Sequence, residues 1–155
     1  MKKGVFIVLD NTLIIDLDDR INVNLIKNWR FNLEVLNCIT YYDSLDYHIN
    51  IISNQYLIAK GILDEKVFLK KIEYVSKEIE NLLGLRKNTI YYSYSIDKES
   101  YSYLPKAGMI YEIALEHELD LKNSIVIGTY NQDKEIADNA GINTYLDSRK
   151  IRLDT

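Results

Sequence analysis

The chain has few of the residues that mark specialised protein classes. Among its 155 residues there are one cysteine, one proline, one tryptophan, two histidines and six glycines. A single cysteine, Cys38, cannot form an internal disulfide, which is typical of a reducing compartment. The lone proline, Pro105, and the scattered glycines exclude a collagen-like segment or a long flexible linker. We therefore expect a compact protein that needs no disulfide framework.

Long apolar runs are also missing. The apolar stretch at residues 5–9 is too short for a signal sequence, and nothing approaches the roughly 18 apolar residues of a membrane span. The formal net charge of −4 argues against a dedicated nucleic-acid binder. With 47% hydrophobic and 27% charged residues, the composition is that of a globular protein. We expect a single cytoplasmic domain spanning residues 1–155, with no membrane association.

Short apolar segments alternate with helical patterns along the chain. Strands are predicted at residues 5–9, 47–52, 89–94, 124–127 and 142–146. Helices are predicted at residues 24–42, 64–84, 106–118 and 133–140, with Asp64 and Gly84 capping the second of them. This alternation predicts an α/β fold of three layers, Rossmann-like, with a central parallel sheet of about five strands and helices on both faces. Ligands bind beyond the carboxyl ends of such strands.

Four segments near these strand ends carry the most specific pattern. They are residues 2–14 (KKGVFIVLDNTLI), 51–55 with 58–61 (IISNQ, IAKG), 104–109 (LPKAGM), and 125–133 with 140–142 (IVIGTYNQD, AGI). In order and spacing they resemble the four motifs of the haloacid-dehalogenase (HAD) superfamily. The closest likeness is to its capless branch, which contains histidinol-phosphate phosphatase, heptose-bisphosphate phosphatase and polynucleotide 3′-phosphatase. The resemblance covers nearly the whole chain and implies a HAD core without a cap domain.

The resemblance also implies roles for individual residues. In this superfamily the first Asp of motif one attacks phosphorus, and a second Asp two residues on protonates the leaving group. The Ser or Thr of motif two and the Lys of motif three bind the phosphate, and the acidic residues of motif four hold Mg²⁺. Asp10 then falls at the acid/base position and Ser53, with Asn54 beside it, at the phosphate-binding position. Asp10 and Asp133 are the remaining candidates for a weak magnesium site.

Three motif positions lack the expected chemical group. Val8 stands where the nucleophile belongs, Leu104 where the phosphate-binding lysine belongs, and Thr129 where the first carboxylate of motif four belongs. Removing the nucleophile from an enzyme that forms a covalent intermediate can cost on the order of 10⁶ in rate. These departures predict a catalytically degenerate phosphatase homologue, a pseudophosphatase that binds or scaffolds, with magnesium weak or absent. Residues 93–103 contain no cysteine or histidine, so we also predict no structural zinc.

Two alternatives stay open at this point. In a shifted register Asp10 is itself the nucleophile of a magnesium-dependent phosphomonoester phosphatase, with Thr12 two residues on, as in P-type ATPases. Lys106, two residues beyond the lost lysine, is then a candidate phosphate ligand. The second alternative is a purely structural subunit of an assembly. Asp10, Ser53 and Asp133 also have simpler explanations, as residues that orient a loop or cap a helix.

Tyrosines are concentrated at residues 91–103, where the chain carries Tyr91, Tyr92, Tyr94, Tyr101 and Tyr103. Tyrosine is enriched in protein interfaces because it offers a large amphipathic surface at low entropic cost. This segment predicts a protein partner or self-association, with packing against the third strand as the simpler alternative. A phosphorylated small molecule is the other expected ligand. Base stacking is disfavoured because interleaved basic residues are missing.

Overall fold

The computed structural model describes residues 1–17, 26–86 and 89–152. The elements follow one another in the order β1 (Gly4–Val8), β2 (Ile14–Asp16), β3 (Trp29–Phe31), α1 (Leu33–Ser44), β4 (His48–Asn54), α2 (Tyr56–Ala59), α3 (Glu65–Leu83), β5 (Ile90–Ser95), α4 (Gly108–His117), β6 (Ile125–Gly128), α5 (Asn131–Ala140), β7 (Thr144–Asp147) and a short 3-10 helix, η1 (Ser148–Lys150). Strands and helices alternate over most of this order, as the sequence predicts.

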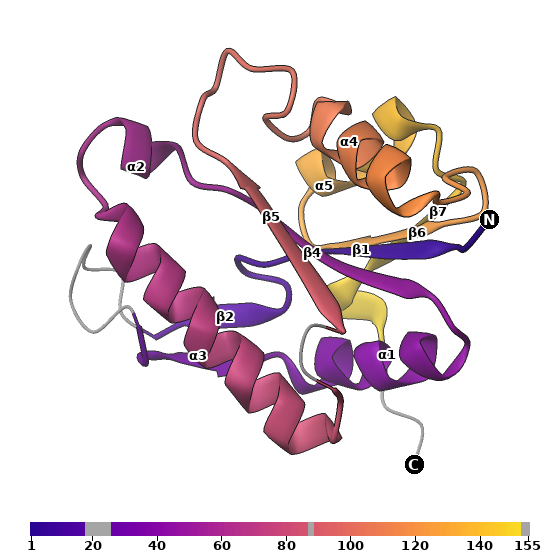
Figure 1. Ribbon diagram of the computed structural model, residues 1–155, viewed down its shortest axis with the longest axis horizontal. Helices are drawn as coiled ribbons and strands as arrows, with labels where there is room; N and C mark the ends of the chain where they lie inside the picture. The colour runs from indigo at the N-terminus through magenta and orange to yellow at the C-terminus, as the bar shows by residue number, and fades with distance from the viewer. Residues whose placement is uncertain (18–25, 87–88, 153–155) are drawn as a thin grey trace.

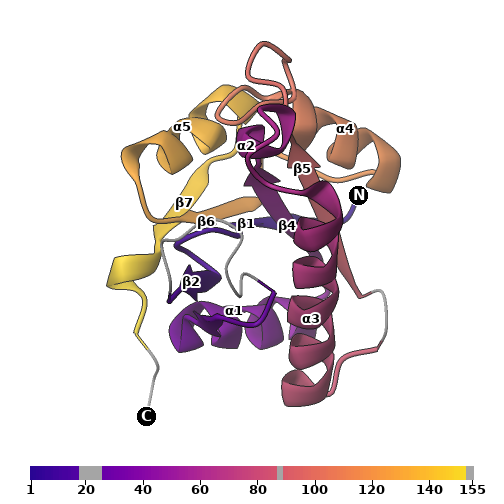
Figure 2. The same cartoon turned by 90° about the vertical axis from the view of Figure 1, so that its left-hand side faces the viewer.

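The centre of the fold is a five-stranded sheet with the strand order β5-β4-β1-β6-β7. All four neighbouring pairs in it are parallel. Helices α1 and α3 cover one face together with the β2–β3 hairpin, and α4 and α5 cover the other (Figures 1 and 2). The predicted α/β fold with three layers and a parallel sheet of five strands is confirmed.

Each face of the sheet has its own apolar cluster, because successive side chains of a strand point to opposite faces. Val5 and Ile7 of β1 pack with the residues of α1 and α3. Phe6, between them, packs with α4 and α5 on the other face. All three side chains are fully buried. The continuous apolar run at 5–9 therefore reflects a central strand that is covered on both sides.

The structure corrects the predicted helix at residues 24–42. Trp29–Phe31 form strand β3, which pairs antiparallel with β2, and α1 begins only at Leu33. Residues 24 and 25 lie outside the described residues. Asn32 caps α1, since its side chain accepts a hydrogen bond from the Glu34 amide at 3.2 Å. The helical spacing of apolar residues continues on both sides of Asn32, which explains the wrong prediction. Asn32, a common N-cap residue, marks the boundary between the strand and the helix in the sequence.

The ends of the other helices follow their capping residues. Asp64 accepts a hydrogen bond from the Lys66 amide at 2.8 Å, and Gly84 ends α3 with a φ of 66°. Both caps agree with the prediction. Helix α5 begins at Asn131, two residues before the predicted start, and β7 begins at Thr144, two residues after it. Within the described residues, no helix has both the length and the apolar character needed to cross a membrane.

Candidate functional site

Asp10 lies just beyond the carboxyl end of β1, and two neighbouring side chains hold its carboxylate. Its Oδ2 accepts hydrogen bonds from Ser53 Oγ at 2.9 Å and from Gln55 Nε2 at 2.8 Å. The same Gln55 amide also donates to Ser53 Oγ at 2.7 Å. Ser53 belongs to β4, the strand next to β1, and Gln55 directly follows that strand. The fold thus brings together Asp10 and Ser53, two of the residues that the sequence singled out.

The Asp10 carboxylate is held in an enclosed setting. Burial raises the pKa of this carboxyl above its ordinary value, while the charge of Lys71 and the hydrogen bond from Ser53 oppose the rise. The charge of Asp16 adds to the rise and the hydrogen bond from Gln55 opposes it. A carboxylate that accepts directed hydrogen bonds in an enclosed site is well suited to act as a nucleophile or as a general base.

A buried ion pair lies on the α3 side of this site. Lys71 of α3 donates to Asp16 Oδ1 of β2 at 2.7 Å, and the side chains are 8% and 35% exposed. Lys71 occupies the buried face of α3 together with Phe68 and Val75. In the sequence, Lys71 lies within the apolar stripe of a predicted helix, which indicates a buried cation. The sequence analysis did not predict that this lysine belongs to the site. Lys71 is the cation with the largest effect on Asp10.

Val8, at the family's nucleophile position, has a packing role. It is the last residue of β1 and packs against the apolar cluster beneath α4 and α5, together with Phe6 and Ile52. After it the chain turns sharply: the amides of Leu13 and Ile14 donate to the carbonyls of Val8 and Leu9, both at 3.1 Å. This turn carries Asp10 to the hydrogen bonds from Ser53 and Gln55.

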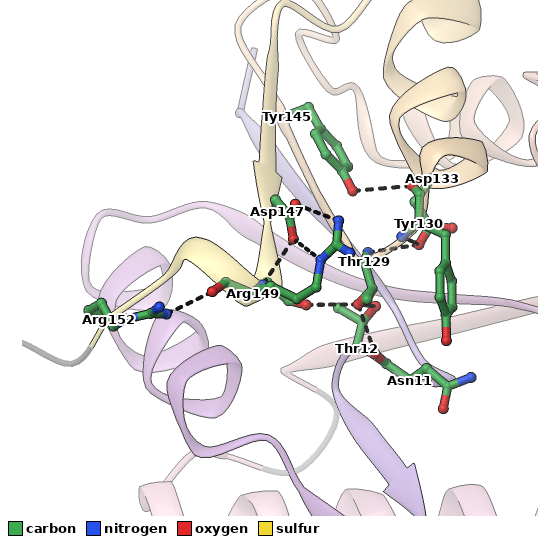
Figure 3. A network of polar contacts seen from close by, with 10 residues as sticks. Asn11, Thr12, Thr129, Tyr130, Asp133, Tyr145, Asp147, Arg149 and Arg152 are labelled. Atoms are coloured by element: carbon green, nitrogen blue, oxygen red, sulfur yellow. Dashed lines mark hydrogen bonds and ion pairs between the residues drawn. The ribbon is translucent and has the colours of Figure 1, made fainter.

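Thr129, at the first carboxylate position of motif four, is the centre of a buried polar network (Figure 3). Its Oγ1 lies 2.7 Å from Thr12 Oγ1, 2.7 Å from Ser148 Oγ and 2.7 Å from the Asn11 carbonyl, to which it donates. Asn11 has a left-handed φ of 60°, which asparagine tolerates better than most residues. The threonine hydroxyl therefore ties the turn after β1 to the ends of β6 and β7.

Asp133 caps helix α5, as the sequence predicts. Its Oδ2 accepts from the Thr129 amide at 2.8 Å and from the Tyr130 amide at 3.0 Å. A Cβ on Gly128 would lie only 2.3 Å from the Asp133 Cβ, so the strand must end in glycine for this capping side chain to fold back. The capping function occupies one oxygen of the only carboxylate left at motif four.

Motif three is joined to the site through the chain backbone. Asn54 donates to the Leu104 carbonyl at 2.7 Å and accepts from the Leu104 amide at 2.9 Å. Its side chain therefore anchors the loop before α4, and its predicted role in phosphate binding stays a prediction. Lys106 Nζ donates to the Lys98 carbonyl at 3.0 Å and to the Ser100 carbonyl at 3.4 Å. In this structure its ammonium group braces the loop at residues 98–106.

The residues of the site do not form a ready-made magnesium centre. Within the described ranges, no group of three or more His, Cys, Asp or Glu side chains is arranged to hold a metal ion. Mg²⁺ requires oxygen ligands in near-octahedral geometry. The two candidate carboxylates, Asp10 and Asp133, each have an oxygen committed to two hydrogen bonds. The donor set therefore does not fit the three-carboxylate centre that the resemblance implies.

The tyrosines of the predicted interface segment divide into two groups. Tyr91, Tyr92 and Tyr94 belong to β5 and are half-buried. Tyr92 and Tyr94 pack at the edge of the cluster beneath α1 and α3. Tyr101 is 61% exposed, and its ring lies 6.4 Å from that of Tyr111. Tyr91 packs against the cluster beneath α4 and α5, so the packing explanation holds for all three strand tyrosines, and a partner for the loop residues stays a prediction.

Comparisons with known proteins place the chain among phosphatases. The model of a family described as polynucleotide kinase 3 phosphatase matches residues 5–147. The D-glycero-alpha-D-manno-heptose-1,7-bisphosphate 7-phosphatase of Campylobacter jejuni is 30% identical over 138 residues, covering 89% of this chain and 78% of that protein. A D-glycero-beta-D-manno-heptose-1,7-bisphosphate 7-phosphatase of Helicobacter pylori is 28% identical over 143 residues, covering 88% and 80%.

A solved structure has the same fold. The D,D-heptose 1,7-bisphosphate phosphatase of B. bronchiseptica, complexed with magnesium and phosphate, superposes with a TM-score of 0.76 at 20% identity, covering 96% of this chain and 84% of that one. The expected resemblance to the capless HAD phosphatases is confirmed.

The prediction of an inactive scaffold is corrected by these relatives. The sequence relatives that match along most of the chain are named as phosphatases, which contradicts a pseudophosphatase and fits the alternative of an active phosphatase better. The prediction preferred the register that places the aliphatic Val8 at the nucleophile position over the shifted register with Asp10, and took Val8 as the loss of the nucleophile. It gave too little weight to Asp10, which the turn after β1 brings to Ser53 and Gln55.

Proposed function

We propose that this chain, which belongs to the polynucleotide kinase 3 phosphatase family of capless HAD phosphatases, hydrolyses phosphate monoesters with Asp10 as its nucleophile. The carrying observation is the Asp10 carboxylate, held by Ser53 and Gln55 at the carboxyl end of the sheet. Ligands of open parallel sheets bind at this edge. Because the relatives are named for a heptose bisphosphate, we propose sugar phosphates as the first substrates to test.

The proposed reaction has two steps. An Asp10 oxygen attacks phosphorus and the bond to the ester oxygen breaks, which gives an aspartyl phosphate and an alkoxide. The alkoxide takes its proton from water, because Thr12, two residues beyond Asp10, is fully buried and engaged by Thr129. Water then attacks the aspartyl phosphate, releasing inorganic phosphate and restoring the carboxylate. Ser53 keeps the attacking carboxylate in place by its hydrogen bond.

Magnesium is expected to bind this chain only weakly. Mg²⁺ supplies positive charge to phosphoryl oxygens in such reactions, but the carboxylates here do not form its usual cluster. We propose that the chain binds Mg²⁺ loosely. Turnover is then expected to rise with Mg²⁺ into the millimolar range instead of saturating at micromolar concentrations, and calorimetric titration with the metal alone checks the same point.

The deciding experiment combines trapping with two matched variants. Purified protein is assayed for phosphate release from a panel of sugar phosphates, a nucleotide and a 3′-phosphorylated oligonucleotide, and is treated with beryllofluoride to trap the aspartyl-phosphate state. Asp10→Asn is expected to abolish turnover and trapping, with a loss of up to about 10⁶ in rate. Val8→Ala is expected to retain both. Turnover that survives in Asp10→Asn, or an adduct at another residue, would overturn the assignment of the nucleophile.

A further inference from the structure

A cavity of about 580 Å³ opens beside the end of β6, away from the Asp10 carboxylate. Residues of α5, β7 and η1 line it, and two tyrosines, Tyr130 and Tyr145, contribute aromatic rings. This volume lies within the range of about 300–1,000 Å³ that is typical of small-molecule sites. The cavity contains none of the groups that hold Asp10, so the proposed phosphatase chemistry does not account for it.

The cavity has a local excess of positive charge on an acidic chain. Three cations line it, Lys134, Arg149 and Lys150, against two carboxylates, Asp138 and Asp147. Asp147 is fully engaged by Arg149, with Oδ1 to Nε at 3.0 Å and Oδ2 to Nη2 at 2.8 Å (Figure 3). In the part of the chain that the structure describes, neither lysine is paired with a carboxylate.

The aromatic wall is held in place by its own contacts. Tyr145 donates to the Tyr130 carbonyl at 3.4 Å (Figure 3). Burial raises the pKa of Tyr145 to about 12, with Asp133 and Asp147 adding to the rise, so its hydroxyl stays protonated. An aromatic ring beside the ammonium groups of Lys134 and Lys150 is suited to a ligand that carries both a planar ring and an anionic group.

Thr129 is shared between the cavity and the candidate active site. It lines the cavity, and its hydroxyl donates to the carbonyl of Asn11, the residue that follows Asp10 (Figure 3). A ligand in the cavity would therefore contact a residue that fixes the turn carrying Asp10. The two sites are separate in their lining residues and joined through this one side chain.

We propose that the cavity is a second binding site for a small organic phosphate with a planar ring, such as a nucleoside monophosphate. Lys134 and Lys150 bind the phosphate, and the ring lies against Tyr145. The proposal does not require the Asp10 reaction, so it is tested in the Asp10→Asn protein, where no ligand is hydrolysed. The probes are adenosine 5′-monophosphate, adenosine, which has no phosphate, and ribose 5-phosphate, which has no planar base.

Binding is measured by calorimetry and by backbone amide NMR shifts. Adenosine 5′-monophosphate is expected to bind about tenfold tighter than either fragment, with its largest shifts at Thr129, Tyr145 and Arg149. The double variant Lys134→Gln, Lys150→Gln is expected to lose about tenfold in affinity for the monophosphate and none for adenosine. The matched control, Lys77→Gln with Lys122→Gln, also removes two positive charges, but from exposed positions outside the cavity. It is expected to bind the monophosphate like the parent.

Each contrary outcome overturns the second site. These outcomes are no binding of the monophosphate, equal affinity for the monophosphate and a fragment, an unchanged affinity in the double variant, and shifts centred on Ser53 and Gln55 instead of the cavity. An inactive parent protein with intact binding at the cavity would defeat the proposed phosphatase function and leave this proposal standing.

Discussion

At the residue scale, Thr129 stands at the first carboxylate position of motif four, and its hydroxyl has a structural hydrogen-bonding role there. Thr129→Val keeps the shape but removes three contacts, to Thr12, Ser148 and the Asn11 carbonyl. Leaving these buried groups short of partners is expected to cost about 1–3 kcal/mol of unfolding free energy. Urea unfolding measures the change. Thr144→Val, the same substitution at an exposed position of β7, is expected to change stability little, and equal losses in the two variants would contradict the assignment.

The buried charge of Asp10, which the proposed reaction needs, is expected to lower the stability of the folded state. Its raised pKa means that the folded state binds the proton more tightly than the unfolded state does. The charge therefore costs stability as the pH rises from the ordinary carboxylate pKa through the raised one. Asp10→Asn removes that charge, so its gain in thermal midpoint over the parent is expected to grow as the pH rises, to about 2 °C or more.

The control for this measurement is Asp138→Asn, at an exposed position of α5, which is expected to leave the midpoint nearly unchanged. A lower midpoint in Asp10→Asn would mean that the hydrogen bonds from Ser53 and Gln55 stabilise the carboxylate by more than its burial costs.

At the element scale, the strands of the central sheet could be predicted from the sequence, whereas the hairpin of β2 and β3 could not. β1 and β6 are buried on both faces, so their apolar runs and the polar residues at their ends were visible in the sequence. β2 and β3 have three residues each, too few to show an alternating pattern. The Lys71–Asp16 pair joins residues 55 positions apart, and only the packing of α3 against this hairpin brings them together. A local pattern cannot reveal such a contact.

This ion pair predicts an asymmetry between its two partners. Asp16→Asn removes the carboxylate that is hydrogen-bonded to the ammonium of Lys71, whose side chain is 8% exposed, and is expected to cost about 3–5 kcal/mol. Lys71→Met leaves Asp16, which is 35% exposed and keeps water, and places an apolar side chain on a buried helix face. Its cost is expected to be about half as large or less. Urea unfolding of both single variants and the double variant measures the coupling.

A double variant no more stable than Asp16→Asn alone would contradict the asymmetry, because removing the buried ammonium should relieve most of that loss. Equal costs for the two single variants would contradict it as well.

At the scale of the whole molecule, the candidate site and a pair of neighbouring histidines lie at opposite ends of the sheet. Asp10 follows the carboxyl end of β1, whereas His48 begins β4 beside Gly4, the first residue of β1. The rings of His48 and His117 lie 4.1 Å apart, and His48 Nδ1 lies 2.7 Å from Asn50 Oδ1. Burial lowers the pKa of His48, and His117 and Lys2 lower it further, against Asn50 and Glu116. Protonation at this end is therefore expected to weaken the fold without touching the Asp10 site.

The sign of the effect follows from that lowered pKa. The unfolded chain binds a proton near the ordinary histidine pKa of about 6.5, whereas the folded chain binds it only at lower pH. The contribution of His48 to stability is therefore fully present above the unfolded pKa and is lost as the pH falls toward and through the folded pKa.

Thermal midpoints of the parent and of His48→Gln are compared between about pH 7.5 and about pH 5.5. The parent is expected to lose more, and parallel curves would show that the pair does not carry the pH dependence. Because the pair is remote from Asp10, beryllofluoride trapping at neutral pH is expected to be equal in the two proteins, which separates a loss of folding from a loss of the site.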